Sequence, residues 1–447
     1  MPQRAMISVA GIRGIVGETL NAEDFVTYAL AFGTMIGRGK VVVGRDPRPS
    51  GEMVRDLVCG ALLSTGCEVV DLDVVPTPTI GIMVRELRAA GGVAITASHN
   101  PLEWNALKFF RPDGRLQTRA DLKALLAIYR RARFRRVRIV KAAGVVRRED
   151  GPRVHIGRVL KNVNAQTIRR RRFRVVLDCC NGAGARLLPD LLGELGCRVT
   201  LLFDDPERAF ERPAEPLPEN LAALSKRVRR EKADIGFAVD PDADRLAIVD
   251  ENGKPLGEER TVTLAAYHLL RRKRSPLVVN LSTTRAIDDV GHTYKVPVHR
   301  TPVGEAHVVE GILRHRALIG GEGNGGVIWP RVANGRDAAA GIGLILEALA
   351  TAREPISRHN HRVPDYVMLK MKLPLKPEKM GSAFSRLERC FAGGGRVWRT
   401  DGLRIDLPRG WFHLRSSGTE PIVRLFVEAP TAEEAQSLSA KVKNLLQ

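Results

Sequence analysis

The sequence is poor in aromatic residues and contains no long apolar run, and both absences narrow the range of functions. Aromatic residues make up 5% of the 447 residues, so the stacking surfaces that bind single-stranded nucleic acids are scarce. No segment reaches the roughly 18 consecutive apolar residues of a membrane span. Residues 1–14 lack the apolar core of a signal peptide. We therefore expect a cytoplasmic protein with no membrane association.

Cysteine pairs of the C-x-x-C type are also missing. The chain has six cysteines, and most of them lie close to apolar runs, as Cys179 does after the apolar segment 175–177. Cysteines in such positions are commonly buried, reduced thiols. This pattern agrees with a reducing compartment and does not resemble a disulfide framework.

Negative charge is in short supply, with 50 acidic residues against 71 basic ones, a net charge of +21 and a pI near 10.2. Such a basic balance raises the hypothesis of a nucleic-acid-binding protein. The arginines form runs at 130–138 and 169–174, but no zinc-finger, RNA-recognition or basic-zipper spacing occurs. We interpret the runs as solvated surface and the remaining basic charge as attraction of an anionic substrate. Nucleic-acid binding stays the alternative from a different functional class, and salt-dependent affinity would test it.

The order of apolar runs predicts a chain of α/β units. At about 100–200 residues per domain, the length suggests roughly three or four domains. Short β-branched runs alternate with helical stretches three times, which is typical of largely parallel sheets. The predicted strands are 40–44, 67–72 and 92–96, then 174–179, 197–203 and 234–239, then 277–281, 296–301 and 317–319.

The C-terminal part has a different pattern. Prolines near 364–377 are followed by alternating strands and by an amphipathic helix at 431–446, which indicates an α+β domain. We therefore expect three similar α/β domains with mixed, largely parallel sheets and a C-terminal α+β domain. Their expected boundaries are 1–149, 150–252, 253–362 and 363–447.

The first loop that could carry chemistry is Thr96-Ala97-Ser98-His99-Asn100-Pro101. It follows a predicted strand, so Ser98 would lie at the carboxyl end of that strand, where α/β sheets bind ligands. A serine hydroxyl in this position can act as a nucleophile or carry a phosphoryl group. The alternative is an ordinary turn that happens to contain Ser98 and His99.

The second loop contains three aspartates, Asp240, Asp242 and Asp244, followed by Arg245. Carboxylates at alternate positions of a tight turn can converge on one hard cation, and Mg²⁺ prefers such oxygen ligands. The glycine and glutamate positions of a calcium-binding EF-hand loop are absent. The alternative is a solvated acidic turn, but three carboxylates this close repel one another unless a positive charge lies among them. Arg245 adds a group that binds phosphate.

The third loop, residues 320–326, is rich in glycine and contains Glu322 and Asn324. Glycine lets a backbone approach a ligand closely, and these two polar side chains suit neighbouring sugar hydroxyls. A flexible linker is the alternative, although the strand-like segments on both sides weaken it.

The fourth loop, residues 415–421, combines arginines, hydroxyls and exposed backbone N–H groups, which together can bind an anion. It lacks the order of a Walker-A loop, and a plain surface turn is the alternative. The predicted phosphate-binding residues are Arg415, Ser417, Gly418, Thr419 and Arg424.

With these four loops in this order, the sequence resembles the α-D-phosphohexomutase superfamily over essentially the whole chain. The resemblance implies three α/β domains and a smaller α+β domain around a central cleft. It implies that Ser98, beside His99, is the residue that becomes phosphorylated. Ser98 and the three aspartates would bind Mg²⁺, and Glu322 and Asn324 would bind the sugar. Arg13, Lys108 and Arg245 match further active-site positions, Lys108 being the lysine assigned to proton transfer.

The resemblance also implies a reaction and a substrate class. Phosphorylated Ser98 would donate its phosphoryl group to a hexose monophosphate, form a hexose 1,6-bisphosphate and take back the other phosphoryl group. The bisphosphate would also act as activator. A phosphatase or a degenerate sugar-phosphate sensor on the same scaffold is a lesser alternative. The resemblance leaves open whether the protein is a monomer or a homodimer.

Three departures from the common pattern bear on the sugar. Many relatives have Ser where Asn324 stands, and some have His where Gly326 stands. Glu305 stands where some glucose and mannose enzymes carry His, and an acid there could pair with a sugar ammonium group. We therefore favour glucosamine phosphate as substrate, with phosphomannomutase or phosphoglucomutase activity as the alternative.

Overall fold

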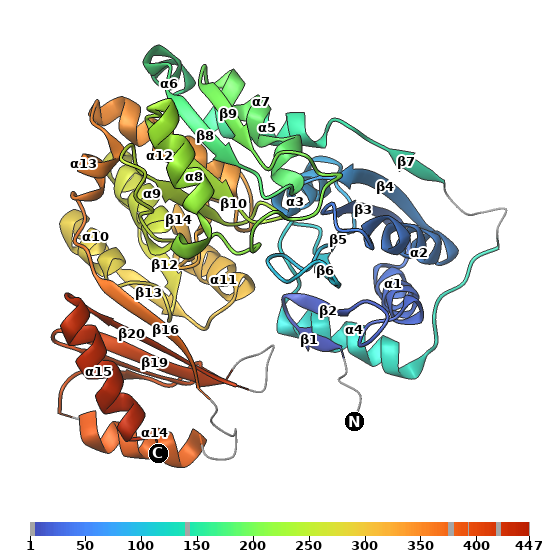
Figure 1. Ribbon diagram of the computed structural model, residues 1–447. Helices are drawn as coiled ribbons and strands as arrows, with labels where there is room; N and C mark the ends of the chain where they lie inside the picture. Colours follow the sequence, from blue (N-terminus) through green and yellow to red (C-terminus); the bar gives the residue numbers. More distant parts are fainter. Residues whose placement is uncertain (1–4, 139–143, 374–379, 392, 417–421, 447) are drawn as a thin grey trace.

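The computed structural model describes residues 5–138, 144–373, 380–391, 393–416 and 422–446 (Figure 1). Its strands form four separate sheets that follow one another along the chain. Figure 1 shows them in an arc, from the first sheet in blue to the last in red. The predicted architecture of α/β units followed by an α+β unit is confirmed.

The first sheet has seven strands in the order β1-β2-β6-β5-β3-β4-β7. Strands β3, β4, β5 and β7 are parallel, whereas β6, β2 and β1 continue the sheet in antiparallel fashion. The apolar β3 is buried, as expected where helices cover both faces of a parallel sheet. The strands are β1 Met6–Ser8, β2 Gly11–Ile15, β3 Gly39–Arg45, β4 Cys67–Val74, β5 Gly91–Ile95, β6 Trp104–Phe110 and β7 Val145–Arg147; the helices are α1 Ala22–Ile36, α2 Gly51–Ser64, α3 Thr77–Glu86 and α4 Arg119–Arg131.

The second and third sheets share one topology. In each, three parallel strands end at a fourth strand that turns back as an antiparallel hairpin, giving the orders β9-β8-β10-β11 and β13-β12-β14-β15. The strands are β8 Arg174–Asp178, β9 Arg198–Leu202, β10 Ile235–Val239, β11 Leu246–Val249, β12 Leu277–Asn280, β13 Val298–Thr301, β14 Ile319–Glu322 and β15 Gly326–Ile328. Their helices are α5 Gly151–Asn162, α6 Ala165–Arg171, α7 Leu188–Glu194, α8 Ala222–Glu231, α9 Glu259–Arg272, α10 Ala286–Tyr294, α11 Glu305–His315, α12 Ala338–Ala352 and α13 Ile356–Asn360.

The fourth sheet is entirely antiparallel, in the order β16-β20-β19-β18-β17. Helices α14 and α15 pack on one face of it, because apolar residues of both helices share a core with β18, β19 and β20. The elements are β16 Val367–Leu373, α14 Met380–Phe391, β17 Arg396–Trp398, β18 Leu403–Leu407, β19 Gly410–Ser416, β20 Val423–Ala429 and α15 Ala432–Asn444.

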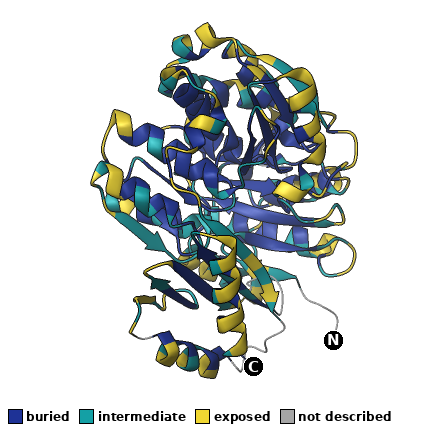
Figure 2. Ribbon diagram, turned by 60° about the vertical axis from the view of Figure 1, so that its left-hand side comes forward, coloured by how far each residue is buried: buried dark blue, intermediate teal, exposed yellow. Residues whose placement is uncertain are grey.

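The largest hydrophobic core joins the second and third sheets and their helices, whereas the first and fourth sheets have cores of their own. Helix α12 is central to the shared core, since it is apolar on almost all sides and buried from Ala338 to Ala350. A helix that is apolar all round can be stable only inside a protein. Figure 2 shows this buried interior in dark blue, with exposed residues on the outer helices and loops.

The arginine runs lie on the surface at the ends of helices. Arg130 and Arg131 end α4, and Arg169 to Arg171 end α6. Positive charge at a helix C-terminus is stabilised by the helix dipole, which gives these five arginines a structural reason. Four of the six cysteines are buried, as expected, but Cys390 is exposed. Within the described part of the chain, every helix is too short or too polar to cross a bilayer.

Candidate active site

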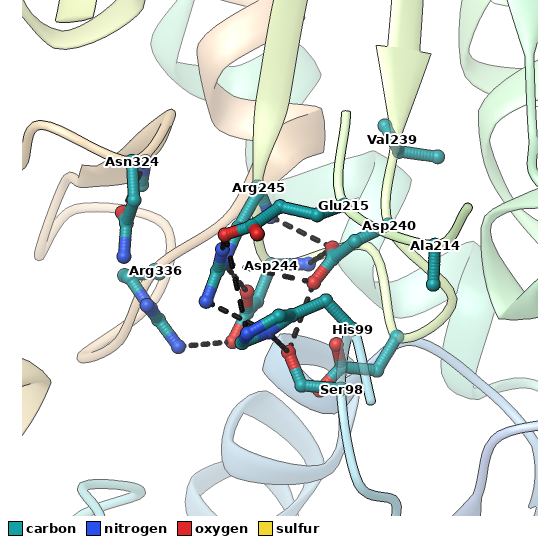
Figure 3. Close-up of polar contacts among 12 residues, drawn as sticks. Ser98, His99, Ala214, Glu215, Val239, Asp240, Asp244, Arg245, Asn324 and Arg336 are labelled. Atoms are coloured by element: carbon teal, nitrogen blue, oxygen red, sulfur yellow. Dashed lines mark hydrogen bonds and ion pairs between the residues drawn. The ribbon is translucent and has the colours of Figure 1, made fainter. Parts of the chain in front are cut away.

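Ser98 lies in the connection between β5 and β6. It is buried, and its φ angle of 54° falls in the left-handed region that residues with a side chain seldom adopt. Its N–H donates to Thr96 Oγ1 at 2.9 Å, and its Oγ donates to Asp240 Oδ2 at 3.0 Å (Figure 3). Such strained residues concentrate at functional sites. The turn therefore brings the hydroxyl of the first loop onto the second loop, which belongs to a different sheet.

Arg48 and Asp46 hold the Ser98 loop in this shape. The buried Arg48 donates to the carbonyl oxygens of Ser98 (2.5 Å) and Asn100 (2.7 Å). Its Nε donates to Asp46 Oδ2 at 3.0 Å, and that oxygen also accepts from the Thr96 hydroxyl at 2.6 Å. Charge-assisted hydrogen bonds of this kind are strong and directional, so the loop is fixed before any ligand binds.

The three aspartates lie in the hairpin that joins β10 to β11. Asp240 Oδ1 accepts from the N–H groups of Asp244 (3.1 Å) and Arg245 (3.0 Å), which closes the turn. All three carboxylates are buried. Burial, followed by the charges of Asp244 and Asp242, raises the pKa of Asp240 well above its usual value.

The pKa of Asp242 is shifted in the opposite direction because Asp242 has a cationic partner. Lys108 Nζ, on β6, donates to Asp242 Oδ2 at 2.6 Å, and the Thr77 hydroxyl at the start of α3 donates to the same oxygen at 2.7 Å. Burial raises the pKa of Asp242, but these two donors outweigh it and hold that pKa below its usual value. Asp242 is therefore a carboxylate with a fixed ammonium beside it.

The aspartate loop fits a divalent cation. One carboxylate oxygen from each of Asp240, Asp242 and Asp244 lies within 4.8 Å of the others. Among the described residues, the Oδ1 atoms of Asp242 and Asp244 are buried without a hydrogen-bond partner, which is costly unless a ligand satisfies them. Mg²⁺ takes oxygen ligands of this kind. These carboxylates, with Ser98 Oγ beside them, would hold it.

Arg245 connects the Ser98 loop to a third segment (Figure 3). It donates to His99 Nδ1 at 2.8 Å and to Glu215 Oε1 at 2.5 Å. Arginine can only donate, so His99 Nδ1 is the acceptor. Burial, then the charges of Arg245 and Arg13, hold the pKa of His99 well below its usual value. His99 is thus a neutral imidazole that orients Arg245.

Arg13 adds a further cation on the same side of the first sheet. It lies on β2, opposite Ala106 of β6, and donates to Asn100 Oδ1 at 2.9 Å. Burial, together with the nearby Arg245, lowers the pKa of Arg13 to about 10, so it stays charged at neutral pH. Arg13, Lys108 and Arg245 therefore gather positive charge next to Ser98, as an anionic ligand requires.

The third predicted loop is the hairpin from β14 to β15. Glu322 is the last residue of β14, and its Oε1 accepts from Asn280 Nδ2 at 2.8 Å and from the Gly304 N–H at 2.9 Å. Asn324 lies in the turn, partly exposed, and its Oδ1 accepts from the Gly326 N–H at 3.2 Å. The structure therefore places an acid and an amide side by side at this edge of the sheet.

Two glycines of this segment have a role different from the expected one. Gly320 and Gly321 belong to β14, where a Cβ would lie 2.2 Å from the carbonyl oxygens of Val278 and Gly326, respectively. They allow neighbouring strands to approach each other. The expectation that the run is a loop from residue 320 onward is therefore wrong, because the strand continues to Glu322.

Arg336 joins the second and third loops, and no motif in the sequence analysis includes it. Its guanidinium nitrogens contact three carboxylates: Asp244 Oδ2 (2.5 Å), Glu322 Oε2 (3.0 Å) and Glu305 Oε2 (3.1 Å). Glu305, the first residue of α11, is thereby placed beside Glu322. Burial raises the pKa of Glu305 to about 7, although Arg336 partly offsets that effect.

Two predicted phosphate-binding residues, Arg415 and Arg424, lie on strands of the last sheet. Arg415 and Arg424 are opposite each other on β19 and β20, so Arg415 belongs to a strand rather than to the expected loop. Asp401 contacts Arg415 Nε at 3.1 Å and accepts from the N–H of Val303, in the third unit, at 2.9 Å. The predicted phosphate-binding residues Ser417, Gly418 and Thr419 lie outside the described residues.

The arrangement suits the transfer of a phosphoryl group. A buried serine hydroxyl lies between a carboxylate loop able to hold Mg²⁺ and a group of cations, and these parts stabilise the charge of a transferring phosphoryl group. The sequence analysis did not find the residues that support this arrangement. Thr77, Glu215 and Arg336 act through contacts made only in the folded chain, and an isolated arginine gives no signal among 71 basic residues.

Comparison with known proteins agrees with this geometry. The sequence matches the four domains described as phosphoglucomutase/phosphomannomutase alpha/beta/alpha domains I, II and III and C-terminal domain, over residues 5–136, 153–253, 257–366 and 368–445. A "phosphoglucomutase/phosphomannomutase" of Thermococcus kodakarensis is 37% identical over 438 residues, covering 95% of each chain. A "probable phosphoglucosamine mutase" of Pyrococcus horikoshii is 36% identical over 442 residues, covering 98% of this chain and 96% of the relative.

A solved structure has the same fold. The crystal structure of a phosphoglucomutase/phosphomannomutase family protein from Burkholderia thailandensis superposes with a TM-score of 0.87 at 25% identity, covering 100% of this chain and 98% of the other. Matches to all four domains in order, over nearly the whole length, leave no part of the architecture unaccounted for. The chain belongs to the phosphoglucomutase/phosphomannomutase family.

Proposed function

We propose that this protein is a phosphohexomutase, an isomerase that interconverts hexose 6-phosphates and hexose 1-phosphates. The reaction would pass through a phosphoserine at Ser98 and a hexose 1,6-bisphosphate. The observation that carries the proposal is the 3.0 Å hydrogen bond from Ser98 Oγ to Asp240, because it joins a buried nucleophile to a loop of three buried aspartates. The names of the relatives support the same class of reaction.

The proposed chemistry consists of two phosphoryl transfers at Ser98. In the first, a substrate hydroxyl oxygen forms a bond to phosphorus while the bond from phosphorus to Ser98 Oγ breaks, and the hydroxyl proton leaves. In the second, Ser98 Oγ forms a bond to the other phosphorus of the bisphosphate while the bond from that phosphorus to the sugar oxygen breaks, and this oxygen regains a proton. We assign proton transfer to Lys108, which the contact between its Nζ and Asp242 Oδ2 at 2.6 Å holds in the site.

Charge on the transferring group would be balanced by groups already in place. When bound, Mg²⁺ supplies neutralisation of the phosphoryl oxygens. Arg13 and Arg245 would donate to the same oxygens, and His99 would keep Arg245 in position. Glu322, Asn324 and Glu305 would bind the sugar, and Arg415, Ser417, Gly418, Thr419 and Arg424 would bind the phosphate that does not react.

We favour glucosamine phosphate as the substrate. Glu322 and Glu305 both contact one guanidinium, so two acids lie close enough to share a sugar ammonium group. Mannose or glucose phosphate is the alternative, since an acid also binds hydroxyls. A cytoplasmic location with hexose phosphates as the small-molecule partner is part of the proposal.

A coupled assay tests both the reaction and the sugar. Glucosamine, glucose and mannose 6-phosphates are compared with Mg²⁺ and catalytic amounts of the matching 1,6-bisphosphate. We expect the 1-phosphate as product, formed fastest from glucosamine 6-phosphate. Release of free phosphate without isomerised product would contradict the proposal, and a faster reaction with mannose or glucose would change the assigned sugar.

Ser98→Ala tests the phosphoserine. We expect activity to fall by more than about a thousandfold, because no covalent carrier of the phosphoryl group remains. Ser385→Ala, at an exposed position of α14, is the matched control and should retain full activity. Full activity of Ser98→Ala would rule out the proposed function.

A further inference from the structure

Arg336 donates hydrogen bonds to three acidic groups of the site. Its three nitrogens contact Asp244, Glu322 and Glu305 (3.1 Å or less), which come from the metal loop, the sugar loop and the start of α11. Figure 3 shows Arg336 reaching toward the aspartate loop from the side of Asn324. The Arg336 side chain is only 12% exposed, so these contacts are made in a largely buried setting.

Two glycines provide the space for this arrangement. A Cβ at Gly326 would lie 2.3 Å from Arg336 Cδ and 2.8 Å from its Cγ. A Cβ at Gly335 would lie 2.6 Å from Glu305 Oε1. Separations below about 3 Å do not occur between such atoms without displacement. The positions of the Arg336 and Glu305 side chains therefore depend on the absence of side chains at 326 and 335.

The backbone of Arg336 is fixed by the next residue. Asp337 accepts from the Ala339 N–H at 2.9 Å and thereby caps α12. Its other oxygen lies 2.9 Å from Nε2 of the buried His155, whose Nδ1 lies 2.9 Å from the Thr79 hydroxyl. Since α3, α5 and α12 meet at this chain of hydrogen bonds, the base of the Arg336 side chain has little freedom to move.

From these contacts we infer that Arg336 is a positioning residue that couples the metal loop to the sugar-binding acids. Its guanidinium holds Glu322 and Glu305 toward one ligand, and at the same time it places a positive charge on Oδ2 of Asp244, whose other oxygen, Oδ1, is left without a hydrogen-bond partner among the described residues. Cation binding at the aspartates and sugar binding at the glutamates are thus linked through one side chain. The inference rests on the proposed function only for the identity of the sugar ligand.

The coupling predicts opposite effects on the two ligands when the charge is removed. In Arg336→Gln, Asp244 is no longer shared and the positive charge that repels a cation is gone. The dissociation constant for Mg²⁺ alone should fall by about 3- to 10-fold. Glu322 and Glu305 lose their common donor, so KM for glucosamine 6-phosphate should rise by about 10-fold or more. Local misfolding would instead weaken both.

Two further variants separate charge from geometry. Arg336→Lys keeps the charge, but an ammonium cannot reach three carboxylates, so we expect KM to rise while Mg²⁺ affinity stays within about 2-fold of the wild type.

Gly326→Ala changes no charge and displaces the Arg336 stem through its new Cβ. KM should rise and Mg²⁺ should bind more tightly, as in Arg336→Gln. Gly60→Ala, on α2 where a Cβ meets nothing within 4 Å, is the control and should change neither quantity.

Isothermal titration calorimetry of the full-length unphosphorylated protein with Mg²⁺ alone measures the dissociation constant for Mg²⁺ without turnover. Steady-state kinetics measures KM and kcat for glucosamine 6-phosphate. Thermal unfolding shows whether each variant is folded. Unchanged or weaker Mg²⁺ binding in Arg336→Gln would overturn the inference, as would an unchanged KM in all three variants. If the wild type shows no mutase activity, the proposed function fails, and the titrations still decide whether Arg336 and a cation compete for Asp244.

Discussion

At the scale of single residues, the site shifts the pKa values of acids of one type in opposite directions. Lys108 and Thr77 hold the pKa of Asp242 below its usual value, whereas burial and two neighbouring carboxylates raise the pKa of Asp240. His99 is kept neutral beside two arginines. These differences come from burial and contacts, since the side chains themselves have ordinary chemistry. The same reasoning applies to Glu305, where it leads to a measurable pH effect.

Glu305 should make the preference for an amino sugar depend on pH. Burial raises its pKa to about 7, so Glu305 is mostly neutral below pH 7 and mostly ionised above it. Only the ionised form pairs with a sugar ammonium. Between pH 6 and pH 8, the ratio of KM for glucosamine 6-phosphate to KM for glucose 6-phosphate should fall by about 3- to 10-fold more in the wild type than in Glu305→Gln.

The ratio is the quantity to measure because both substrates carry the same phosphate, whose titration cancels. The amine of glucosamine titrates equally in both enzymes, so the difference between wild type and Glu305→Gln isolates the glutamate. Parallel pH profiles of the two enzymes would show that Glu305 does not contact the sugar ammonium.

The residues that sequence could predict differ physically from those it could not. Ser98 and the three aspartates stand in short loops directly after buried strands, and local pattern is enough to place them at the carboxyl ends of those strands. Arg336 is important because it donates hydrogen bonds to three carboxylates, which are 14 to 92 positions away in the chain. No local pattern in the sequence records such a convergence.

At the scale of elements, three of the four loops occupy one topological position. The Ser98 loop joins β5 to β6, the aspartate loop joins β10 to β11, and the Glu322 loop joins β14 to β15. Each is the connection from a parallel strand to its antiparallel neighbour. The strand alternation in the sequence predicts the repeated unit. Of the returning strands, it indicates β15, whose segment is strand-like, but not β6 and β11, which are defined by pairing and not by a distinctive composition.

Helix α12 depends on Asp337 for more than its cap. Replacing Asp337 by Ala removes the cap on the Ala339 N–H and leaves the buried His155 without its partner. We expect the free energy of unfolding to fall by about 2–4 kcal/mol, from a lost cap and an unsatisfied buried polar group. Thr431→Ala, at the exposed cap of α15, should cost only about 1 kcal/mol. Urea unfolding of both variants measures the difference, and equal costs would mean that the His155 contact contributes nothing.

At the scale of the whole molecule, the domains that the sequence separates are not equally independent. The second and third units share one core, in which Val159 of α5 packs against Gly343 of α12; a Cβ at Gly343 would lie 2.9 Å from Val159 Cγ1. The fourth unit has a core of its own. Sequence pattern marks where strands and helices repeat, but it does not show which apolar faces pack together, and the joint core is therefore visible only in the structure.

This shared core predicts which parts of the molecule lose stability when one core residue is replaced. Val159→Ala removes two buried methyl groups and should lower the free energy of unfolding by about 1–3 kcal/mol. Because the core is continuous, native-state hydrogen exchange should show lost protection in β12 and β14 of the third unit as well as in β8 and β10 of the second. Strands β19 and β20 should keep their protection. Val427→Ala, at an equally buried position of the fourth core, should show the reverse pattern. If Val159→Ala leaves β12 and β14 unaffected, the second and third units unfold separately and the shared core does not couple them.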